Sequence, residues 1–290
     1  MSDSLAAAFY ADQALHESVE VVENVPLARD TFRLRLACPE IARRIVPGQF
    51  VMLRLGEGDD PLLGRPLALY DTFINEAGEP VGVDIVYLVV GRLTRILAQR
   101  QPGQRLEIWG PLGNGFTPAA ADHLIMVAGG IGQTPFVALA RQQLGLRTYG
   151  EPPHEVTSTP KVTLCYGARS EEYLAGVDDF RQLGVEVHIS TDDGSAGYHG
   201  LVTDLLTKNL AGQGGSPRIV CCGPEPMMEA VSKIATATKV PCQVSLETPM
   251  ACGIGICFSC VARVRQPDGE WDYKRTCVEG PVFDSSAIVW

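Results

Sequence analysis

The chain has 290 residues, enough for two domains with cores of their own and a small appendage. Its formal net charge of −10 and its scattered basic residues exclude the basic stripe that binds a phosphate backbone, so we expect no nucleic-acid partner. No stretch approaches the ~20 apolar residues of a membrane span, and the N-terminus, with Asp3 and Asp12, lacks the regions of a signal peptide. We therefore expect a cytoplasmic protein.

The first part of the chain, from about Glu17 to Leu112, is rich in short β-type segments separated by turns such as Pro47-Gly48. One helix is expected at 94–101. The expected strands cover residues 31–36, 49–55, 66–71, 82–90 and 105–109. Several short strands at this spacing predict a small antiparallel β-barrel.

After Pro118 strands and helices alternate, which predicts an α/β domain with a parallel sheet covered on both faces. A polar, Pro-containing stretch at 147–160 is expected to be a surface loop. The expected strands are 123–128, 161–166, 185–190, 218–222 and 240–246, and the expected helices are 171–183, 201–210 and 225–239. The chain should thus comprise a barrel at 17–116, an α/β domain at 117–246 and a small C-terminal subdomain at 247–290.

Two glycine turns follow strands of the α/β domain: 129–135 (GGIGQTP) and 222–227 (CGPEPM). Neither matches the G-x-G-x-x-G dinucleotide fingerprint. Both place small residues and bare amides at the carboxyl ends of parallel strands, where ligands bind. A purely structural tight turn is the alternative for each.

Two further features lie in the barrel. Arg65 opens a strand after a glycine turn, and its forked guanidinium suits a cofactor diphosphate; a solvent-facing arginine is the alternative. Thr94 lies at the start of the expected helix, where a hydroxyl and free amides suit an anion, and a simple helix cap is the alternative.

The C-terminal segment carries a cysteine cluster with the C-x4-C-x2-C spacing of plant-type ferredoxin loops and a fourth ligand downstream. Gly253 and Gly255 allow the backbone to wrap closely around a small inorganic centre and to aim amides at its sulfurs. The spacing predicts a [2Fe–2S] cluster. Its ligands are Cys252, Cys257, Cys260 and Cys277.

A zinc ribbon and a set of inert or disulfide-bonded thiols are the alternatives for this cluster. Zinc sites favour paired C-x2-C knuckles, whereas the segment has one such pair and no histidine. The remaining cysteines lie among apolar neighbours and are interpreted as reduced, mostly buried residues: Cys38, Cys165, Cys221, Cys222 and Cys242.

The order of these motifs, with YGAR at 166–169 between them, resembles the ferredoxin-NADP reductase superfamily. More closely, it is similar to the electron-transfer subunits of NAD-linked dihydroorotate dehydrogenases, from about residue 19 to residue 284. The family often has a hydroxyl residue where Ala68 stands, Arg at Leu88 and Gly at Leu93.

The resemblance implies FAD on the barrel, NAD as co-substrate on the α/β domain and a cluster facing a second protein, with no catalytic residue of the chain's own. The implied flavin contacts are Arg65, Pro66, Leu67, Ala68, Tyr87 and Thr94, with backbone from Val86, Leu88 and Leu93. The implied nicotinamide cleft comprises Gly129, Gly130, Gly132, Thr134, Pro135, Cys222, Gly223 and Pro224.

The implied function is electron transfer from dihydroorotate to NAD in pyrimidine biosynthesis, through an FMN-containing catalytic partner in a heterotetramer with two copies of each subunit. NAD is preferred over NADP because Asp192 and Asp193 would repel the 2′-phosphate that Arg169 could bind. Alternatives are a diaphorase subunit of a hydrogenase or of a ferredoxin-linked transhydrogenase and, from another class, a zinc-stabilised binding module without redox activity.

Overall fold

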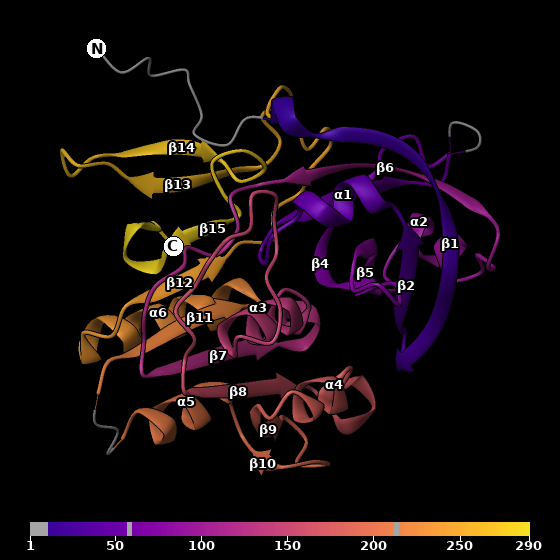
Figure 1. The fold of residues 1–290 in the computed structure, drawn as a ribbon. Helices are drawn as coiled ribbons and strands as arrows, with labels where there is room; N and C mark the ends of the chain where they lie inside the picture. The colour runs from indigo at the N-terminus through magenta and orange to yellow at the C-terminus, as the bar shows by residue number, and fades with distance from the viewer. Residues whose placement is uncertain (1–10, 57–59, 212–214) are drawn as a thin grey trace.

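The computed structural model describes residues 11–56, 60–211 and 215–290, which form a β-barrel, a helix-covered sheet and a terminal hairpin (Figure 1). Asp3, used above to argue against a signal peptide, lies outside the described residues. Across the part of the chain that is described, no helix is both long and apolar enough to cross a membrane.

Six antiparallel strands close the barrel in the order β1-β2-β5-β4-β3-β6, which confirms the antiparallel barrel predicted from the sequence. Alternate side chains, such as Val21, Leu34 and Ile85, point inward and form its core. The elements are β1 (Leu15–Ala28), β2 (Thr31–Ala37), α1 (Pro39–Arg44), β3 (Phe50–Arg54), β4 (Arg65–Ile74), β5 (Pro80–Leu88), α2 (Arg92–Leu97) and β6 (Arg105–Leu112), preceded by a 3-10 turn at Ala11–Gln13.

Two details of the barrel differ from the prediction. Strand β1 was absent from the expected segments because only two of its fourteen residues, Val19 and Val21, are buried, so its apolar residues do not mark a clear buried face. Helix α2 begins and ends earlier than the expected 94–101, because Gly91 already provides the extended N-cap and the chain turns ahead of Pro102.

The second layer is a sheet in the order β10-β9-β8-β7-β11-β12-β15, parallel except for β15 at its edge. Its central strands are continuous apolar runs because both faces are covered. The strands are β7 (His123–Gly129), β8 (Lys161–Ala168), β9 (Glu186–Thr191), β10 (Tyr198–His199), β11 (Pro217–Cys222), β12 (Cys242–Ser245) and β15 (Val282–Asp284).

Helices cover the two faces of this sheet separately. Side chains of α3 and α4 share one core with Leu124 and Met126 of β7, and side chains of α5 and α6 share another with Ile125 and Val127. The helices are α3 (Phe136–Gln143), α4 (Val177–Gln182), α5 (Val202–Leu210) and α6 (Glu225–Thr238). The α/β domain with its parallel sheet is therefore as predicted.

The helix expected at 171–183 is broken. A 3-10 turn at Glu171–Tyr173 is followed by α4, and between them Gly176 has a φ of +69°, which favours glycine. A side chain there would begin 2.3 Å from the hydroxyl of Tyr70, so the break also lets the barrel approach the sheet.

The loop expected on the surface at 147–160 is instead anchored at one end to the barrel. Tyr149 is buried, and its hydroxyl donates to Asp71 of β4 at 2.6 Å. Arg141 of α3 also donates to Asp71, at 2.9 Å. A buried carboxylate needs such partners, and these contacts tie barrel and sheet together.

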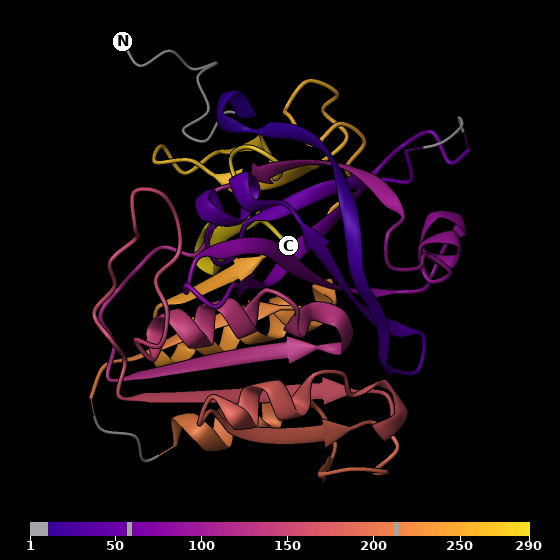
Figure 2. The same ribbon diagram turned by 45° about the vertical axis from the view of Figure 1, so that its right-hand side comes forward.

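The terminal segment leaves β12, forms the hairpin of β13 (Val261–Arg265) and β14 (Trp271–Arg275), and returns as β15 to pair with β12. A 3-10 turn at Ser285–Ala287 follows. Figures 1 and 2 show this hairpin, in yellow and gold, beside the barrel and away from β8 and β9. The small apolar core of the terminal segment, around Cys260 and Cys277, is completed by Phe50, Met52 and Leu112 of the barrel.

Candidate functional site

The sheet reverses its strand order at β7, because β8 lies on one side of it and β11 on the other. Ligands of open parallel sheets bind at such a point, beyond the carboxyl ends of the strands. The turn at 129–135 follows β7, and the turn at 222–227 follows β11. Ala128 and Cys222 pair in register, so the two predicted glycine turns lie side by side at this position.

The glycines of these turns have different roles. A Cβ on Gly132 would lie 2.3 Å from the carbonyl oxygen of Cys222, and one on Gly129 would lie 2.6 Å from the sulfur of Met227. Packing alone therefore requires glycine at both positions. Gly130 has a φ of +54°, and a Cβ there would meet no atom within 4 Å. Gly130 is thus the glycine that faces open space where a ligand could approach.

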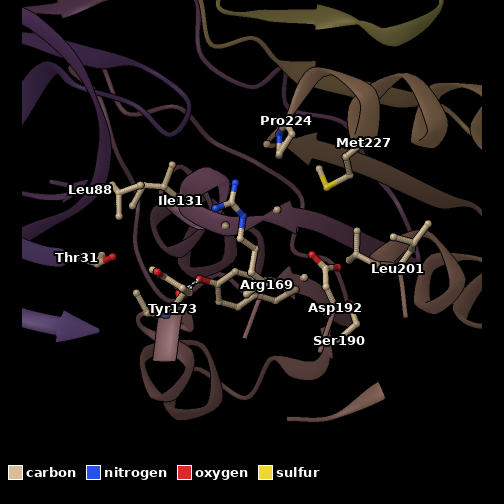
Figure 3. A pocket seen from close by; sticks show the side chains of 18 of the residues that line it. Thr31, Leu88, Ile131, Arg169, Tyr173, Ser190, Asp192, Leu201, Pro224 and Met227 are labelled. Atoms are coloured by element: carbon tan, nitrogen blue, oxygen red, sulfur yellow. Dashed lines mark hydrogen bonds between the residues drawn. The ribbon is translucent and has the colours of Figure 1, made fainter. Parts of the chain in front are cut away.

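A cavity of about 810 Å³, here called the sheet cavity, opens over these turns (Figure 3). This volume is typical of sites for small molecules and cofactors. Arg169, after β8, and Asp192, after β9, extend into it. Its wall includes five residues predicted from the sequence: Leu88, Gly129, Gly130, Gly223 and Pro224.

Asp192 and Asp193, treated together in the sequence, are separated by the structure. Asp192 lines the sheet cavity. Asp193 accepts hydrogen bonds from the backbone and hydroxyl of Ser195, at 2.9 and 2.6 Å, and these bonds lower the pKa of its carboxyl. Only Asp192 can therefore act directly on a bound ligand.

A second cavity of about 790 Å³, here called the barrel cavity, lies between the barrel, the sheet and the terminal segment. It brings together most of the remaining predicted residues. These are Arg65, Pro66, Leu67, Ala68, Val86, Tyr87, Leu88, Leu93, Thr94, Thr134, Pro135 and Cys222. Gly132 lines neither cavity, in keeping with its packing role.

Arg65 stands at the start of β4 on the wall of the barrel cavity. It is exposed, and its Nη1 donates to the carbonyls of Leu63 and Gly64 at 3.1 and 2.9 Å. These bonds hold the guanidinium beside the cavity and leave donors of its fork available to an anion.

Tyr87 and Thr94 have side chains engaged elsewhere. The ring of Tyr87 stacks on Phe32 in the barrel core, and its hydroxyl bonds to Asn24 at 3.1 Å. The hydroxyl of Thr94 accepts from the backbone of Val90 and Gly91 and so caps α2. Thr94 therefore caps α2, and both Tyr87 and Thr94 lie on the wall of the barrel cavity.

Glu247 was missed by the sequence reasoning and lies on the walls of both cavities. Its Oε1 is 4.0 Å from the sulfur of Cys222, and burial raises the pKa of its carboxyl. An available signal was its position just after β12, where a polar residue meets the ligand edge of the sheet. The carboxyl of Glu247 can form a hydrogen bond with a ligand in either cavity.

The four predicted cluster cysteines come together as two pairs. The sulfurs of Cys260 and Cys277 are 3.2 Å apart, and Cys252 lies close enough to Cys257 to help lower the pKa of the Cys257 thiol. In the described ranges, no three His, Cys, Asp or Glu side chains are grouped for a single metal ion. Two pairs fit a two-iron cluster, in which each iron takes two thiolates, whereas tetrahedral zinc needs its ligands about one point.

The thiols of this loop are chemically distinct from the other cysteines. A hydrogen bond from Ser259 lowers the pKa of Cys257 to about 6. The bond between Cys260 and Cys277 lowers the pKa of Cys260 to about 6 and raises that of Cys277. Thiolates are the form that binds metal. The other five are buried as expected, and burial raises their pKa: Cys38, Cys165, Cys221, Cys222 and Cys242.

The backbone of the loop turns toward the sulfurs. Gly253 and Gly255 have φ values of +74° and +82°, as their predicted role requires. The amide of Ile254 donates to the sulfur of Cys252 at 3.4 Å, and the nearby amide of Gly255 opposes the rise in the pKa of Cys277. Phe258 also has a positive φ, of 55°, which costs a non-glycine residue about 1–2 kcal/mol. The loop therefore has the wrapped geometry that a small inorganic centre requires.

The barrel cavity and the cysteine loop share a wall. Ala251 and Ser259, which flank the outer cysteines of the loop, line the cavity. Trp109 of the barrel donates to the carbonyl oxygen of Cys252 at 2.9 Å. One continuous arrangement therefore joins the sheet cavity, the barrel cavity and the cysteines.

Comparison with known families agrees with this arrangement. A model of the iron–sulfur cluster binding domain of dihydroorotate dehydrogenase B matches residues 247–289. A model of oxidoreductase NAD-binding domains matches residues 126–233. These matches cover the cysteine loop and the two glycine turns.

Curated relatives match over nearly the full length. The electron transfer subunit of dihydroorotate dehydrogenase B (NAD(+)) from Desulforamulus reducens is 38% identical over 266 residues, or 91% of this chain and 94% of that protein. The subunit of the same name from Geobacillus thermodenitrificans is 37% identical over 277 residues, or 94% of this chain and 98% of that protein. The resemblance predicted from the motifs is thus confirmed.

Solved structures share the fold. A chain of an NADH-dependent reduced ferredoxin-NADP oxidoreductase aligns with a TM-score of 0.77 and 29% identity, covering 94% of this chain and 90% of that one. An Amycolatopsis cytochrome P450 reductase aligns with a TM-score of 0.62 and 23% identity, covering 78% of this chain and 67% of that one. The second likeness is one of fold alone.

Proposed function

Because this chain belongs to the family of electron transfer subunits of dihydroorotate dehydrogenase B, we propose that it carries electrons between a dihydroorotate-oxidising partner and NAD, in pyrimidine biosynthesis. One observation carries the proposal. The barrel cavity adjoins the sheet cavity through Ile131 and Glu247 and reaches the cysteine loop through Ser259. A cofactor in the middle cavity would therefore lie between a nicotinamide on one side and a cluster on the other.

FAD, when bound, exchanges a hydride with nicotinamide and single electrons with an iron–sulfur cluster, and the protein supplies binding and orientation. The wall of the barrel cavity suits the flavin, because its exposed surface is mostly apolar. Arg65 would offer diphosphate oxygens the guanidinium donors that its two carbonyl contacts leave available. Apolar contact would come from Pro66, Leu67, Ala68, Val86, Leu88 and Leu93, and backbone contact from Tyr87 and Thr94.

In the sheet cavity, we assign the approach of the dinucleotide to Gly130, which leaves space above its backbone. Gly223 and Pro224 would form the opposite wall, with Thr134, Pro135 and Cys222 on the flavin side. Asp192 would accept from a ribose hydroxyl and repel a 2′-phosphate, which favours NAD over NADP. The three functional units would be 17–116 for FAD, 117–246 for NAD and 247–290 for the cluster.

The cluster ligands would be Cys252, Cys257, Cys260 and Cys277, and the partner would dock over the exposed tip of their loop. Ile256 and Phe258 flank Cys257 there and are 70% and 60% exposed. Exposed apolar side chains beside an electron exit suit a protein interface. Dihydroorotate yields two electrons and a cluster takes one at a time, so the partner needs a cofactor that divides the pair. FMN meets that need.

We further propose a heterotetramer with two copies of each subunit, which the mass of the purified complex tests. A cytoplasmic location is supported by the nine cysteines, none of which forms a disulfide. Fractionation of the native cells tests that location.

The test of the function is reconstitution with the candidate partner. The purified complex should contain FMN, FAD and iron, and it should reduce NAD with dihydroorotate as the only reductant. The chain alone should oxidise NADH with ferricyanide and leave dihydroorotate unchanged. A complex that holds all its cofactors yet does not couple dihydroorotate to NAD would contradict the proposal.

A subunit of a ferredoxin-linked transhydrogenase is a second candidate, favoured by the likeness to the NADH-dependent reduced ferredoxin-NADP oxidoreductase chain. The two candidates differ in the partner. If the native partner exchanges electrons with reduced ferredoxin and NADP rather than with dihydroorotate, the second function holds.

A further inference from the structure

Arg275, the last residue of β14, makes several contacts around the cysteine loop. Its Nη1 donates to the carbonyl oxygen of Gly255 at 3.0 Å, and its guanidinium lies 5.0 Å from the centroid of the Phe258 ring. Its side chain is only 13% exposed. It therefore contacts the loop on both sides of the exposed Cys257.

The base of Arg275 is held as firmly as its tip. The carboxylate of Glu279 accepts from the backbone amide of Arg275 at 2.6 Å and from its Nε at 3.3 Å. The carbonyl of Arg275 accepts from the amides of Val278 and Glu279. These bonds fix the direction in which the guanidinium points, because both ends of the side chain are bound.

Residue 255 is consequently held from two sides. Its carbonyl accepts from Arg275 at 3.0 Å, and Val278 packs against its α-carbon, where a Cβ would lie 3.1 Å from the Val278 side chain. With a φ of +82°, Gly255 lies where backbone conformations are least restricted for glycine, so external contacts decide its orientation. Arg275 thus holds the loop backbone between Cys252 and Cys257 through Gly255.

We propose that Arg275 is a positioning residue that raises the reduction potential of the cluster by fixing the loop backbone at Gly255, between Cys252 and Cys257, and by placing a positive charge beside the loop. This inference rests on the four-cysteine assignment proposed above. Hydrogen bonds to sulfur and nearby positive charge both favour the reduced cluster, which carries one more negative charge. The pairing with Glu279 offsets part of the charge effect, so the hydrogen-bond geometry is the larger contribution.

The experiment is a redox titration of the full-length, flavin-loaded protein, followed by electron paramagnetic resonance of the cluster. R275Q removes both the positive charge and the paired N–H donors of the guanidinium, whereas R275K keeps the charge without the paired donors. The control is R263Q, because Arg263 lies on the same hairpin but packs against Trp271 at 5.8 Å. For R275Q we expect a roughly tenfold lower equilibrium constant for one-electron reduction, a midpoint shift of about −59 mV. R275K should shift in the same direction by less, with an altered resonance spectrum, and R263Q should match the wild type.

Wild-type midpoint and spectrum in both Arg275 variants would overturn the inference. If R275Q fails to retain iron, R275K decides: a lowered midpoint supports the inference, and a wild-type midpoint refutes it. Equal shifts in R275Q and R263Q would also refute it, because net charge alone would then explain them. Failure of the cluster assignment is recognised separately, because the wild type would then lack iron and the resonance of a reduced cluster.

Discussion

The sheet and the cysteine loop both present backbone amides to a ligand, but they are stabilised differently. The turns of the sheet rest on two large apolar cores, and Gly129 and Gly132 are required by contacts within the protein itself. The core under the cysteine loop is small, and two of its buried residues, Cys260 and Cys277, are themselves proposed metal ligands. Most of the other buried residues of that core belong to the barrel.

The difference separates a preformed site from one that depends on its ligand. Burial of apolar side chains stabilises the sheet whether or not a nucleotide is bound. With the proposed cluster bound, the cysteine loop would gain much of its stability from metal–thiolate bonds, because metal binding and folding are coupled where the apolar core is small. We therefore expect a variant that loses the cluster to keep the rest of its fold. Variants in the sheet turns should form two groups: those that fail to fold, and those that fold but bind the ligand poorly.

Cys257→Ala gives the largest expected effect. It removes one of four thiolates, so iron should be lost and electron transfer to the partner abolished. FAD should stay bound, and NADH oxidation with ferricyanide should persist, because both cavities lie largely outside the loop. Cys165→Ala, in the sheet core, is the matched control and should keep its iron. Full-rate coupling of the partner to NAD by the folded Cys257 variant would refute the relay.

Gly130→Val sharpens the comparison within the sheet. Its side chain would enter the open sheet cavity and overpack a ligand there, at a cost of about 3 kcal/mol, or ~100-fold in NADH affinity. Stopped-flow reduction of bound flavin measures this loss. Gly132→Val is the control: it should fail to fold, because a Cβ there meets the carbonyl of Cys222. Wild-type saturation by the Gly130 variant would mean that the dinucleotide approaches elsewhere.

Arg65→Ala tests the barrel cavity. Loss of a charge-assisted hydrogen bond to the diphosphate should cost about 1.5–3 kcal/mol, or ~10- to 100-fold in FAD affinity. The dissociation constant of FAD measures it, and iron content should be unchanged. Arg54→Ala is the control, because Arg54 lies on neighbouring β3 but not on the cavity wall. An unchanged dissociation constant would refute the assignment of Arg65 to the flavin site.

Asp192→Ser gives the smallest effect. Removing one partly solvated charge should improve NADPH use relative to NADH by about 1 kcal/mol, or roughly fivefold in kcat/KM. Asp193→Ser is the matched control and should leave the ratio unchanged, because Asp193 is bonded to Ser195 and does not line the cavity. An equal response of both variants would show a general charge effect.

The sequence predicted the elements whose patterns are local. The apolar run of β7 and the C-x4-C-x2-C spacing each identify a feature by themselves. β1 was not predicted because only two of its residues are buried, and β15 because only its partner β12 makes a strand of three residues stable. Tyr149 is buried because Asp71, far away in the sequence, accepts its hydroxyl.

For the candidate site, it was easier to predict which residues lie near the cavities than to predict which way their side chains point. The strand pattern of β5 could not tell which side chains face the cavity, and Tyr87 turned out to point into the barrel core. Glu247 has no motif of its own; it becomes notable because two cavities meet at its carboxyl. Such facts depend on long-range packing, which a single sequence does not reveal.

The most direct test of the central claim is anaerobic addition of NADH to the purified chain, monitored by optical absorbance and low-temperature electron paramagnetic resonance. In the wild type, we predict that the flavin bleaches and that the signal of a reduced two-iron cluster appears. In Cys257→Ala, the flavin should bleach without that signal. Bleaching of the wild-type flavin with no cluster signal, under NADH or dithionite, would contradict the account.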